Sequence, residues 1–294
     1  MKSGFVSIVG RPNVGKSTLL NSLLERKIAI TSNVSGTTRN VIQGIYNDDD
    51  SQIVFIDTPG IHKPVNKLGN FMNNQAYSMI DEVDIILFLV DVTEKFGKGD
   101  QFILNRIKDL DKPIFLILNK VDLINKKELL NIISNYSSLY DFKEIIPISS
   151  LKNDNITDLI STIKNYLPRD GQMYDEDMVT NISRDFYIAE VVREKLLRLT
   201  TKEVPHTITC LVENFEEDEN IANINVLIIV DRENLKKIII GKNGQMLKKV
   251  GILARSDIEE FLGKQVNLKT YVKVIEDWRE KEKYLRELGF NELN

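Results

Sequence analysis

The stretch "IVGRPNVGKSTLL", residues 8–20, decides the fold of the first part of this 294-residue chain. An apolar run leads into a loop rich in Gly, Pro and Asn, and a Lys-Ser-Thr followed by leucines comes next. Residues 10–17 match G-x-x-x-x-G-K-[ST] between a predicted strand and a predicted helix. The glycines let backbone N–H groups surround phosphate oxygens, and the start of the helix adds its positive dipole end. The stretch therefore predicts a phosphate-binding loop.

Two side chains of this loop have expected roles. Lys16 would reach the β and γ phosphates and act in catalysis, and Ser17 would ligate Mg²⁺. A glycine-rich turn with a chance lysine is the alternative, and the strand–loop–helix context argues against it. The residues expected around the nucleotide are Gly10, Arg11, Pro12, Asn13, Val14, Gly15, Lys16, Ser17 and Thr18. The motif alone does not distinguish ATP from GTP.

The segment "NKVD", residues 119–122, favours GTP. It follows an apolar strand, and a carboxylate at Asp122 can accept hydrogen bonds from N1–H and N2–H₂ of guanine. Adenine offers neither donor, so the carboxylate would stay unpaired. By itself the segment could be a solvated turn, but it follows a phosphate loop here. The guanine contacts are expected from Asn119, Lys120 and Asp122, with main-chain support from Ser149 and Ser150.

Two further loops complete the predicted site. In "DTPG", Asp57, Thr58, Pro59 and Gly60, the acid would hold Mg²⁺ through water, and the Gly60 N–H would touch the γ phosphate in catalysis. In "SGTTR", residues 35–39, a threonine can complete the Mg²⁺ shell only while the γ phosphate is present, which makes an order–disorder switch. Thr38 is favoured over Thr37 as this ligand and as a catalytic residue.

Apolar runs alternate with amphipathic segments from residue 4 to about residue 167. Near-continuous apolar strands are typical of a parallel sheet buried on both faces, so we expect a doubly wound, mostly parallel α/β domain over residues 1–168. A Pro- and Gly-containing acidic stretch without periodicity predicts a linker at residues 169–182.

Residues 183–294 show another order: one helix, two strands, two helices around "GKNG", and a strand. This α-β-β-α-α-β order matches the second type of KH fold, whose GxxG loop clamps single-stranded RNA. Basic residues flank the loop, with no acid between residues 235 and 255, although a solvated helix face is the alternative. The expected RNA-binding residues are Lys236, Lys237, Gly241, Lys242, Asn243, Gly244, Lys248, Lys249 and Arg255.

The bulk composition fits a soluble globular protein, with 42% hydrophobic residues, 28% charged residues and a net charge of −4. Cys210 is the sole cysteine, so no disulfide can form within the chain, as expected in a reducing compartment. The chain opens without a secretory signal, and no apolar run approaches the roughly 20 residues of a spanning helix. We expect a cytoplasmic protein.

The nucleotide motifs resemble those of translation-factor-like small GTPases in order and spacing. "RPNVGKS", "GTTR" and "DTPGI", together with the C-terminal "LRELGF", resemble the Era family over nearly the whole chain. The resemblance implies a Mg²⁺-dependent GTPase that binds the single-stranded 3′ region of small-subunit ribosomal RNA and assists maturation of the small ribosomal subunit. It also implies peripheral association with the inner face of the cell membrane, for which the sequence offers no lipid anchor. No stable oligomer is expected.

Catalysis is expected to be slow without help. Ile61 stands where Ras-like enzymes use a glutamine to orient the attacking water, and isoleucine cannot hydrogen-bond water. In relatives, an asparagine at the place of Asn13 helps hold a K⁺ ion, so the resemblance implies that role here; an ordinary polar loop residue is the alternative. His62 is given no catalytic role. Ser150, where relatives often carry alanine, and the loop pair Lys242-Asn243 depart from the family pattern.

The leading hypothesis is a switch. GTP and Mg²⁺ would order residues 35–39 and 57–70, reposition the KH-like domain and favour RNA binding, and hydrolysis to GDP would release the RNA. One alternative is a constitutive RNA-binding module whose nucleotide site is structural. Another is a GTPase that modifies or escorts transfer RNA, although the sequence shows no cysteine or cofactor site for modification chemistry.

Overall fold

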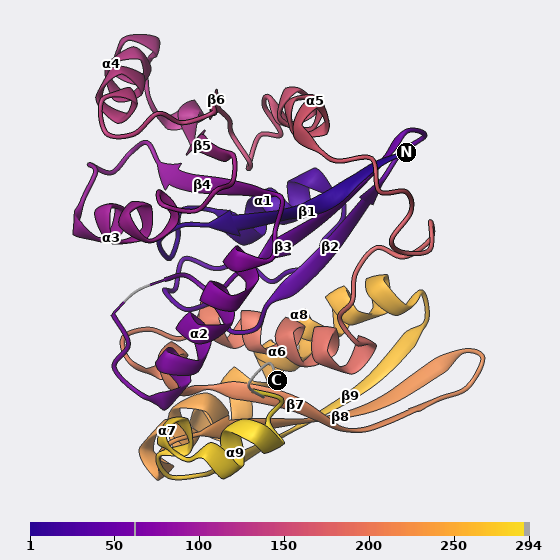
Figure 1. Cartoon of the computed structure of the whole chain (residues 1–294). Coiled ribbons are helices and arrows are strands. Elements are labelled where there is room, and N and C mark those ends of the chain that lie inside the picture. Colours follow the sequence, from indigo (N-terminus) through magenta and orange to yellow (C-terminus); the bar gives the residue numbers. More distant parts are fainter. Residues whose placement is uncertain (62, 291–294) are drawn as a thin grey trace. The chain divides into compact units, whose positions relative to one another are not determined.

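The computed structural model describes residues 1–61 and 63–290 of the chain (Figure 1). Contacts between Cα atoms divide the chain into two compact units. Unit 1 contains Met1–Ala29, Thr38–Pro64 and Gly69–Asn181, and unit 2 contains Ile30–Thr37, Val65–Leu68 and Ile182–Asn294. Two short segments of the first quarter of the chain therefore group with the C-terminal part.

Unit 1 is built on a six-stranded sheet with the order β2-β3-β1-β4-β5-β6. Strand β2 runs antiparallel to β3, and all other neighbours are parallel, which confirms the predicted doubly wound, mostly parallel fold. Every residue of β3, β4 and β5 is buried, because helices cover both faces. The strands are β1 (Lys2–Val9), β2 (Ile42–Asn47), β3 (Ser51–Asp57), β4 (Ile85–Asp91), β5 (Ile114–Asn119) and β6 (Glu144–Pro147).

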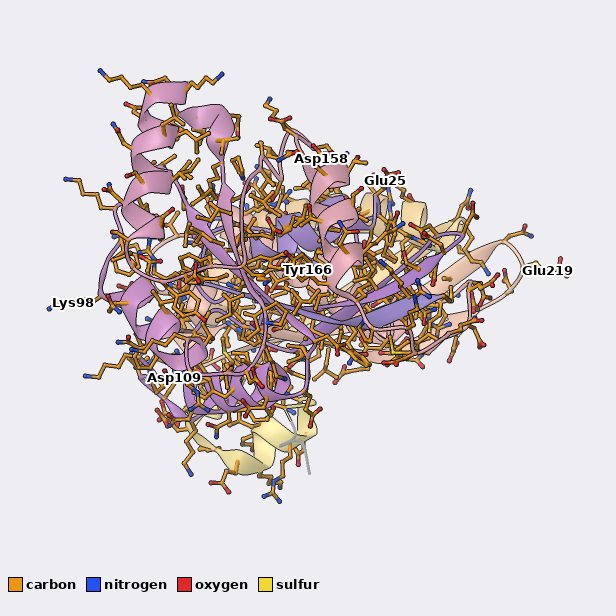
Figure 2. The ribbon with its side chains drawn as sticks, turned by 45° about the horizontal axis from the view of Figure 1, so that its top comes forward. Glu25, Lys98, Asp109, Asp158, Tyr166 and Glu219 are labelled. Atoms are coloured by element: carbon orange, nitrogen blue, oxygen red, sulfur yellow. The ribbon has the colours of Figure 1, made fainter. Side chains whose placement is uncertain are left out.

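The helices of unit 1 lie on both faces of this sheet (Figure 1). Helices α2, α3 and α4 pack with the sheet in one apolar cluster, and α1 packs against β3 and α5. In Figure 2, Tyr166 lies on α5; its hydroxyl donates to Glu144 of β6 at 2.6 Å. The helices are α1 (Lys16–Leu23), α2 (Lys67–Asp81), α3 (Lys98–Ile107), η1 (Val121–Leu123), α4 (Lys126–Ser137) and α5 (Ile156–Tyr166).

The chain beyond α5 returns along strand β2. The N–H of Ile45 donates to the Val179 carbonyl at 2.8 Å, and the Thr180 hydroxyl donates to the Gln43 carbonyl at 2.7 Å. These contacts give the exposed edge of β2 hydrogen-bonding partners. Much of the stretch between residues 169 and 182 is therefore fixed to the sheet of unit 1.

Unit 2 contains a three-stranded sheet with the order β7-β8-β9, in which β8 is antiparallel to β7 and parallel to β9. Helices α6, α7 and α8 share one apolar core with it, and Glu219 marks the tip of the β7–β8 hairpin (Figure 2). The predicted α-β-β-α-α-β order is confirmed. The elements are α6 (Arg184–Leu199), η2 (Val204–Thr207), β7 (Thr209–Glu217), β8 (Ile221–Val230), α7 (Glu233–Ile240), η3 (Lys242–Gly244), α8 (Gln245–Leu262), β9 (Gln265–Val274), η4 (Trp278–Glu280) and α9 (Glu282–Glu287).

The C-terminal elements pack onto unit 2 through Trp278. Its side chain is fully buried, its indole N–H donates to the Thr207 carbonyl at 2.9 Å, and its ring stacks with that of Phe290. This tryptophan therefore has a packing role within unit 2. Within residues 1–61 and 63–290, none of the helices is both long and apolar enough to cross a bilayer.

Candidate nucleotide and nucleic-acid sites

The phosphate loop follows β1 and ends at α1, as the sequence predicts. Gly15 has φ 104°, a left-handed conformation that favours glycine, and a Cβ there would overlap the side-chain amide of Asn119. Lys16 is 6% exposed, and its ammonium donates to the carbonyls of Gly10 at 3.1 Å and Arg11 at 3.0 Å. The loop is therefore closed around its lysine, with the N-terminus of α1 directly behind it.

Three oxygen-bearing side chains of unit 1 converge beside this loop. The Ser17 hydroxyl donates to Asp57 at 2.5 Å and lies 2.7 Å from the Thr38 hydroxyl. The second carboxylate oxygen of Asp57, Oδ1, is buried without a hydrogen-bond partner among the described residues. Hydroxyl and carboxylate oxygens are the ligands that Mg²⁺ prefers, so this set fits the ion, with an unsatisfied oxygen available to it or to its water.

The two threonines of the switch segment face different ways. The Thr37 hydroxyl donates to the Val34 carbonyl and lies 2.6 Å from the Ser32 hydroxyl, so it closes a local turn. The Thr38 hydroxyl meets Ser17 instead. Only Thr38 of this pair therefore stands among the proposed magnesium ligands.

Burial perturbs both charges of the phosphate site. Burial raises the pKa of Asp57 to about 6, although Lys16, Ser17 and Thr38 oppose the rise. Burial also lowers the pKa of Lys16 to about 8, against the attraction of Asp57. A cation beside Asp57 and a phosphate beside Lys16 would each favour the charged form, so the site is suited to taking both together.

The residues expected at the base lie at the carboxyl ends of β5 and β6. Asn119 donates to the Val14 carbonyl at 2.8 Å and accepts from the backbone N–H and hydroxyl of Ser150, both at 3.0 Å. It thereby ties the phosphate loop to the last loop of the sheet. Ser149 donates to Asp122 at 2.6 Å and orients this exposed carboxylate. The arrangement leaves one oxygen of Asp122 for a base.

Two cations of the predicted nucleotide site, Arg11 and Lys120, are fixed by acids. Lys120 donates to the Asn13 carbonyl at 3.0 Å and pairs with Asp91, while Asn13 itself has a left-handed φ of 66°. The Arg11 side chain pairs with Glu94 at 2.6 Å and Asp100 at 2.8 Å. Arg11 is therefore held toward acids around α3, which leaves only its backbone for the nucleotide.

The loop after β3 approaches the phosphate loop closely. Thr58 donates to the Ile8 carbonyl at 3.0 Å, and a Cβ at Gly60 would lie 2.9 Å from Pro12. Pro59 lies between these two contacts in the chain. Ile61 is 2% exposed and belongs to the apolar core, so its side chain is turned away from solvent. His62, which was given no catalytic role, lies outside the described residues.

Unit 2 contains a groove of about 360 Å³ between α8 and β9. Gly244, Lys248 and Arg255, all expected to bind RNA, line it. Apolar and polar side chains make up the rest of the lining: Leu247, Gly251, Ile252, Val266, Asn267, Leu268 and Thr270. A cationic rim around partly exposed aliphatic side chains suits a single strand with its phosphates outward and its bases inward.

The GxxG loop ends α7 and starts α8. Gly241 has φ 73° and ψ 173°, and a Cβ there would lie 2.7 Å from that of Met246, so only glycine fits. Asn243 and Gly244 are also left-handed, with φ 52° and 73°. Lys242 and Asn243 are exposed at the turn. The backbone is thus bared where a phosphate backbone would approach.

The other basic residues predicted for RNA do not line this groove. Lys236 and Lys237 lie on α7, and Lys249 lies on α8. Sequence reasoning missed the contributions of Gly251 and Ile252. The signal was present, because positions 244, 248, 251, 252 and 255 recur at helical spacing and share one face of α8. Strand β9 also lines the groove, but no comparable pattern in its sequence indicates this.

Comparisons with known proteins identify a GTPase domain and a KH domain in this chain. A family model described as a 50S ribosome-binding GTPase matches residues 5–120, and a KH-domain model matches residues 203–279. A crystal structure of Era in complex with MgGDPNP and nucleotides 1506–1542 of 16S ribosomal RNA is 44% identical, covers 99% of both chains and has a TM-score of 0.96. A variant of Aquifex aeolicus Era bound to GDP·AlF4⁻ is 43% identical, with the same coverage and TM-score.

Proposed function

Because this chain belongs to the Era family of GTPases, we propose that it binds the 3′ region of small-subunit ribosomal RNA and assists maturation of that subunit. One observation carries the proposal. The chain is similar over 99% of its length to Era crystallised with both MgGDPNP and that RNA region, and its own groove offers Gly244, Lys248 and Arg255 to a single strand. Binding to ribosomal RNA would place this activity in the cytoplasm.

We assign GTP hydrolysis to residues 1–168 and RNA binding to residues 183–294, with residues 169–182 as the connection. Lys16 and the Gly60 N–H would act on the γ phosphate, and Ser17, Thr38 and Asp57 would hold Mg²⁺. When bound, the ion would neutralise developing negative charge on the phosphates. The hydroxyl of Thr38 meets Ser17 within 2.7 Å, which supports this set. GTP binding would favour RNA binding, and hydrolysis would release the RNA.

Slow hydrolysis follows from Ile61, whose buried side chain cannot orient water. We assign a K⁺ site to Asn13 of the phosphate loop. Its backbone is left-handed, and its carbonyl accepts a hydrogen bond from Lys120. Replacing Na⁺ by K⁺ at equal ionic strength should then raise the turnover rate, and Asn13→Ala should remove the increase. An unchanged rate in K⁺ would reject the site. The test measures the GTP turnover rate of the parent protein and of Asn13→Ala, each in Na⁺ and in K⁺.

The proposed switch is tested by binding a short single-stranded RNA of the 3′-end sequence to the full chain. Fluorescence anisotropy at fixed salt would compare the protein loaded with a GTP analogue and with GDP. We expect tighter binding with the analogue, and loss of binding in Gly241→Asp, which places a side chain and a negative charge where the RNA backbone would approach. Thermal unfolding of that variant checks that the fold survives.

Other results would point elsewhere. Equal RNA affinity in both nucleotide states would favour the alternative of a constitutive RNA-binding module with a structural nucleotide site. Absence of RNA binding in both states would reject the RNA assignment while leaving the GTP site intact. Membrane association is tested separately by flotation with anionic vesicles, because none of the contacts described above provides an anchor.

A further inference from the structure

Residues Ile30–Thr37, which overlap the first part of the switch segment at 35–39, belong to unit 2 and contact helix α6 there. Glu194 accepts a hydrogen bond from the N–H of Thr31 at 3.0 Å, and Arg198 donates to the Thr31 carbonyl at 3.1 Å. At the other end of the segment, Arg193 donates to the Thr37 carbonyl. Helix α6 therefore holds the backbone at both ends of this loop.

The charges that make these contacts are deeply buried. Arg193 and Glu194 are both 0% exposed. Arg193 pairs with Glu190 at 2.6 Å, yet its Nη1 has no hydrogen-bond partner among the described residues. Buried ion pairs are costly, and apolar side chains often replace them without loss of stability. A buried guanidinium that is incompletely paired but reaches a switch carbonyl therefore indicates a role beyond packing.

The residue after Thr37 carries the hydroxyl of the proposed magnesium site. The Thr37 carbonyl and the Thr38 N–H share one planar peptide group. A donor that fixes the Thr37 carbonyl therefore fixes the plane of this peptide group. It thereby restricts the position of the Thr38 backbone and of its hydroxyl group. The same hydroxyl lies 2.7 Å from Ser17.

We propose that Arg193 is a positioning residue for GTP-dependent chemistry: it orients the Thr37–Thr38 peptide so that Thr38 meets Mg²⁺ and the γ phosphate. This inference rests on the proposed function and names how the RNA-binding unit regulates the nucleotide site. The neighbouring Lys195 pairs with Asp257 of α8 at 2.5 Å, and α8 carries the groove residues. Helix α6 thereby connects the Thr37 carbonyl to helix α8. If the two sites are coupled, GTP and RNA must each change the affinity for the other by the same factor.

The test compares Arg193→Lys with the full-length parent protein. Lysine keeps the positive charge near Glu190 but lacks the fork that reaches two partners. We expect affinity for a GTP analogue to fall roughly 10-fold, from loss of one charge-assisted hydrogen bond, and the Mg²⁺ concentration needed for GTP binding to rise. GDP affinity should stay within about twofold, because the γ phosphate is absent. The turnover number at saturating GTP should also fall.

A matched control is Arg184→Lys, which makes the same exchange on the same helix, where the arginine pairs with Glu217. It should leave nucleotide affinities unchanged. If Arg193→Lys does not fold, the paired variant Glu190→Gln/Arg193→Gln removes both charges together and should give the same selective loss of GTP affinity. Equal losses of GTP and GDP affinity, or no loss of either, would overturn the positioning role.

RNA binding separates this inference from the proposed function. A parent protein that binds RNA more tightly with the GTP analogue, alongside an Arg193→Lys protein that has lost this preference, supports both. If the variant keeps the full preference, the positioning role is rejected and the function stands. If the parent shows no preference, the proposed switch is rejected, and the positioning role is decided by the GTP, GDP and Mg²⁺ affinities.

Discussion

Asp122 is the carboxylate expected to select the base. Its Oδ1 accepts from Ser149, and the side chain is otherwise exposed where the base is expected. Two hydrogen bonds from guanine to a charged acceptor are worth about 1.5–3 kcal/mol each. A change that keeps the shape but alters the donor pattern should therefore alter the preferred base.

Asp122→Asn should lower GTP affinity by about 100-fold or more, from loss of those charge-assisted bonds. Affinity for xanthosine triphosphate should rise, because the new amide N–H can donate to the C2 carbonyl that replaces the guanine amino group. The Ser149 hydroxyl can still donate to the amide oxygen. Nucleotide titrations with GTP, XTP and ATP measure the exchange, and an unchanged GTP:XTP preference would remove Asp122 from the base site.

Thr38 and Thr37 offer a paired test of the metal site. Thr38→Val removes the hydroxyl beside Ser17 with little change in shape, and should weaken Mg²⁺-dependent GTP binding roughly 10-fold. Thr37→Val removes a hydroxyl that closes a local turn. It should destabilise that turn by about 1 kcal/mol, and should weaken Mg²⁺-dependent GTP binding less than Thr38→Val does. Titrating Mg²⁺ against GTP binding compares them; the reverse ranking would assign the ligand to Thr37.

Helix α8 is the element on which RNA binding is expected to depend. Its groove face includes Gly251, and a Cβ there would meet nothing within 4 Å. Glycine in a helix interior costs about 1 kcal/mol relative to good helix formers. A glycine on an open helix face that lines a groove fits a surface that a ligand approaches closely.

Gly251→Leu should therefore preserve or raise thermal stability while filling the groove, and should lower RNA affinity at least tenfold. Ser256→Leu is the matched control: the serine is exposed on the same helix but does not line the groove. Anisotropy gives the affinities, and thermal unfolding gives the stabilities. Equal RNA affinity of the two variants would place the RNA elsewhere on unit 2.

Helices and strands whose apolar residues follow a clear pattern could be predicted from the sequence. Those whose polar and apolar residues are mixed could not. Strands β1, β3, β4, β5 and β6 read as apolar runs because both faces of the sheet are covered. Strand β2 shows no such run, because its sequence "IQGIYN" mixes polar and apolar residues at the antiparallel edge. In α2, the asparagines and the glycine obscure the helical period of its apolar residues.

The same contrast holds within the site. Glycines, the lysine and the serine of the phosphate loop follow one another in the chain, so one motif reveals them together. Asp91 at the end of β4 holds Lys120, and Asp100 in α3 holds Arg11; these partners are distant in the sequence, and only folding brings them together. The contact of Arg193 with Thr37 spans 156 positions, and no local pattern announces it.

The charge of the molecule is unevenly distributed. The whole chain has a net charge of −4, but the segment around α7 and α8 is purely basic between residues 235 and 255. RNA binding should then weaken steeply with salt despite the acidic total. We expect that segment, and not the average charge, to set the affinity of the protein for RNA.

Lys248→Gln should lower RNA affinity and reduce the slope of log affinity against log salt by about 0.7, the value for one phosphate contact of a single strand. Lys98→Gln on α3 makes the same charge change in unit 1, where the side chain points to solvent (Figure 2), and should leave the slope unchanged. Binding measured over a range of KCl concentrations gives both slopes. Equal slopes in the two variants would show that Lys248 meets no phosphate.

The membership of Ile30–Thr37 in unit 2 also sets an order of events during synthesis of the chain. Thr31 is polymerised 163 positions before its partner Glu194. At about 5–20 residues per second, the helix that anchors the loop follows roughly 8–30 s later. The nascent chain can complete its phosphate loop and its central strands within that interval while the loop still lacks its anchor. The contacts between the loop and α6 can therefore form only after α6 has been translated.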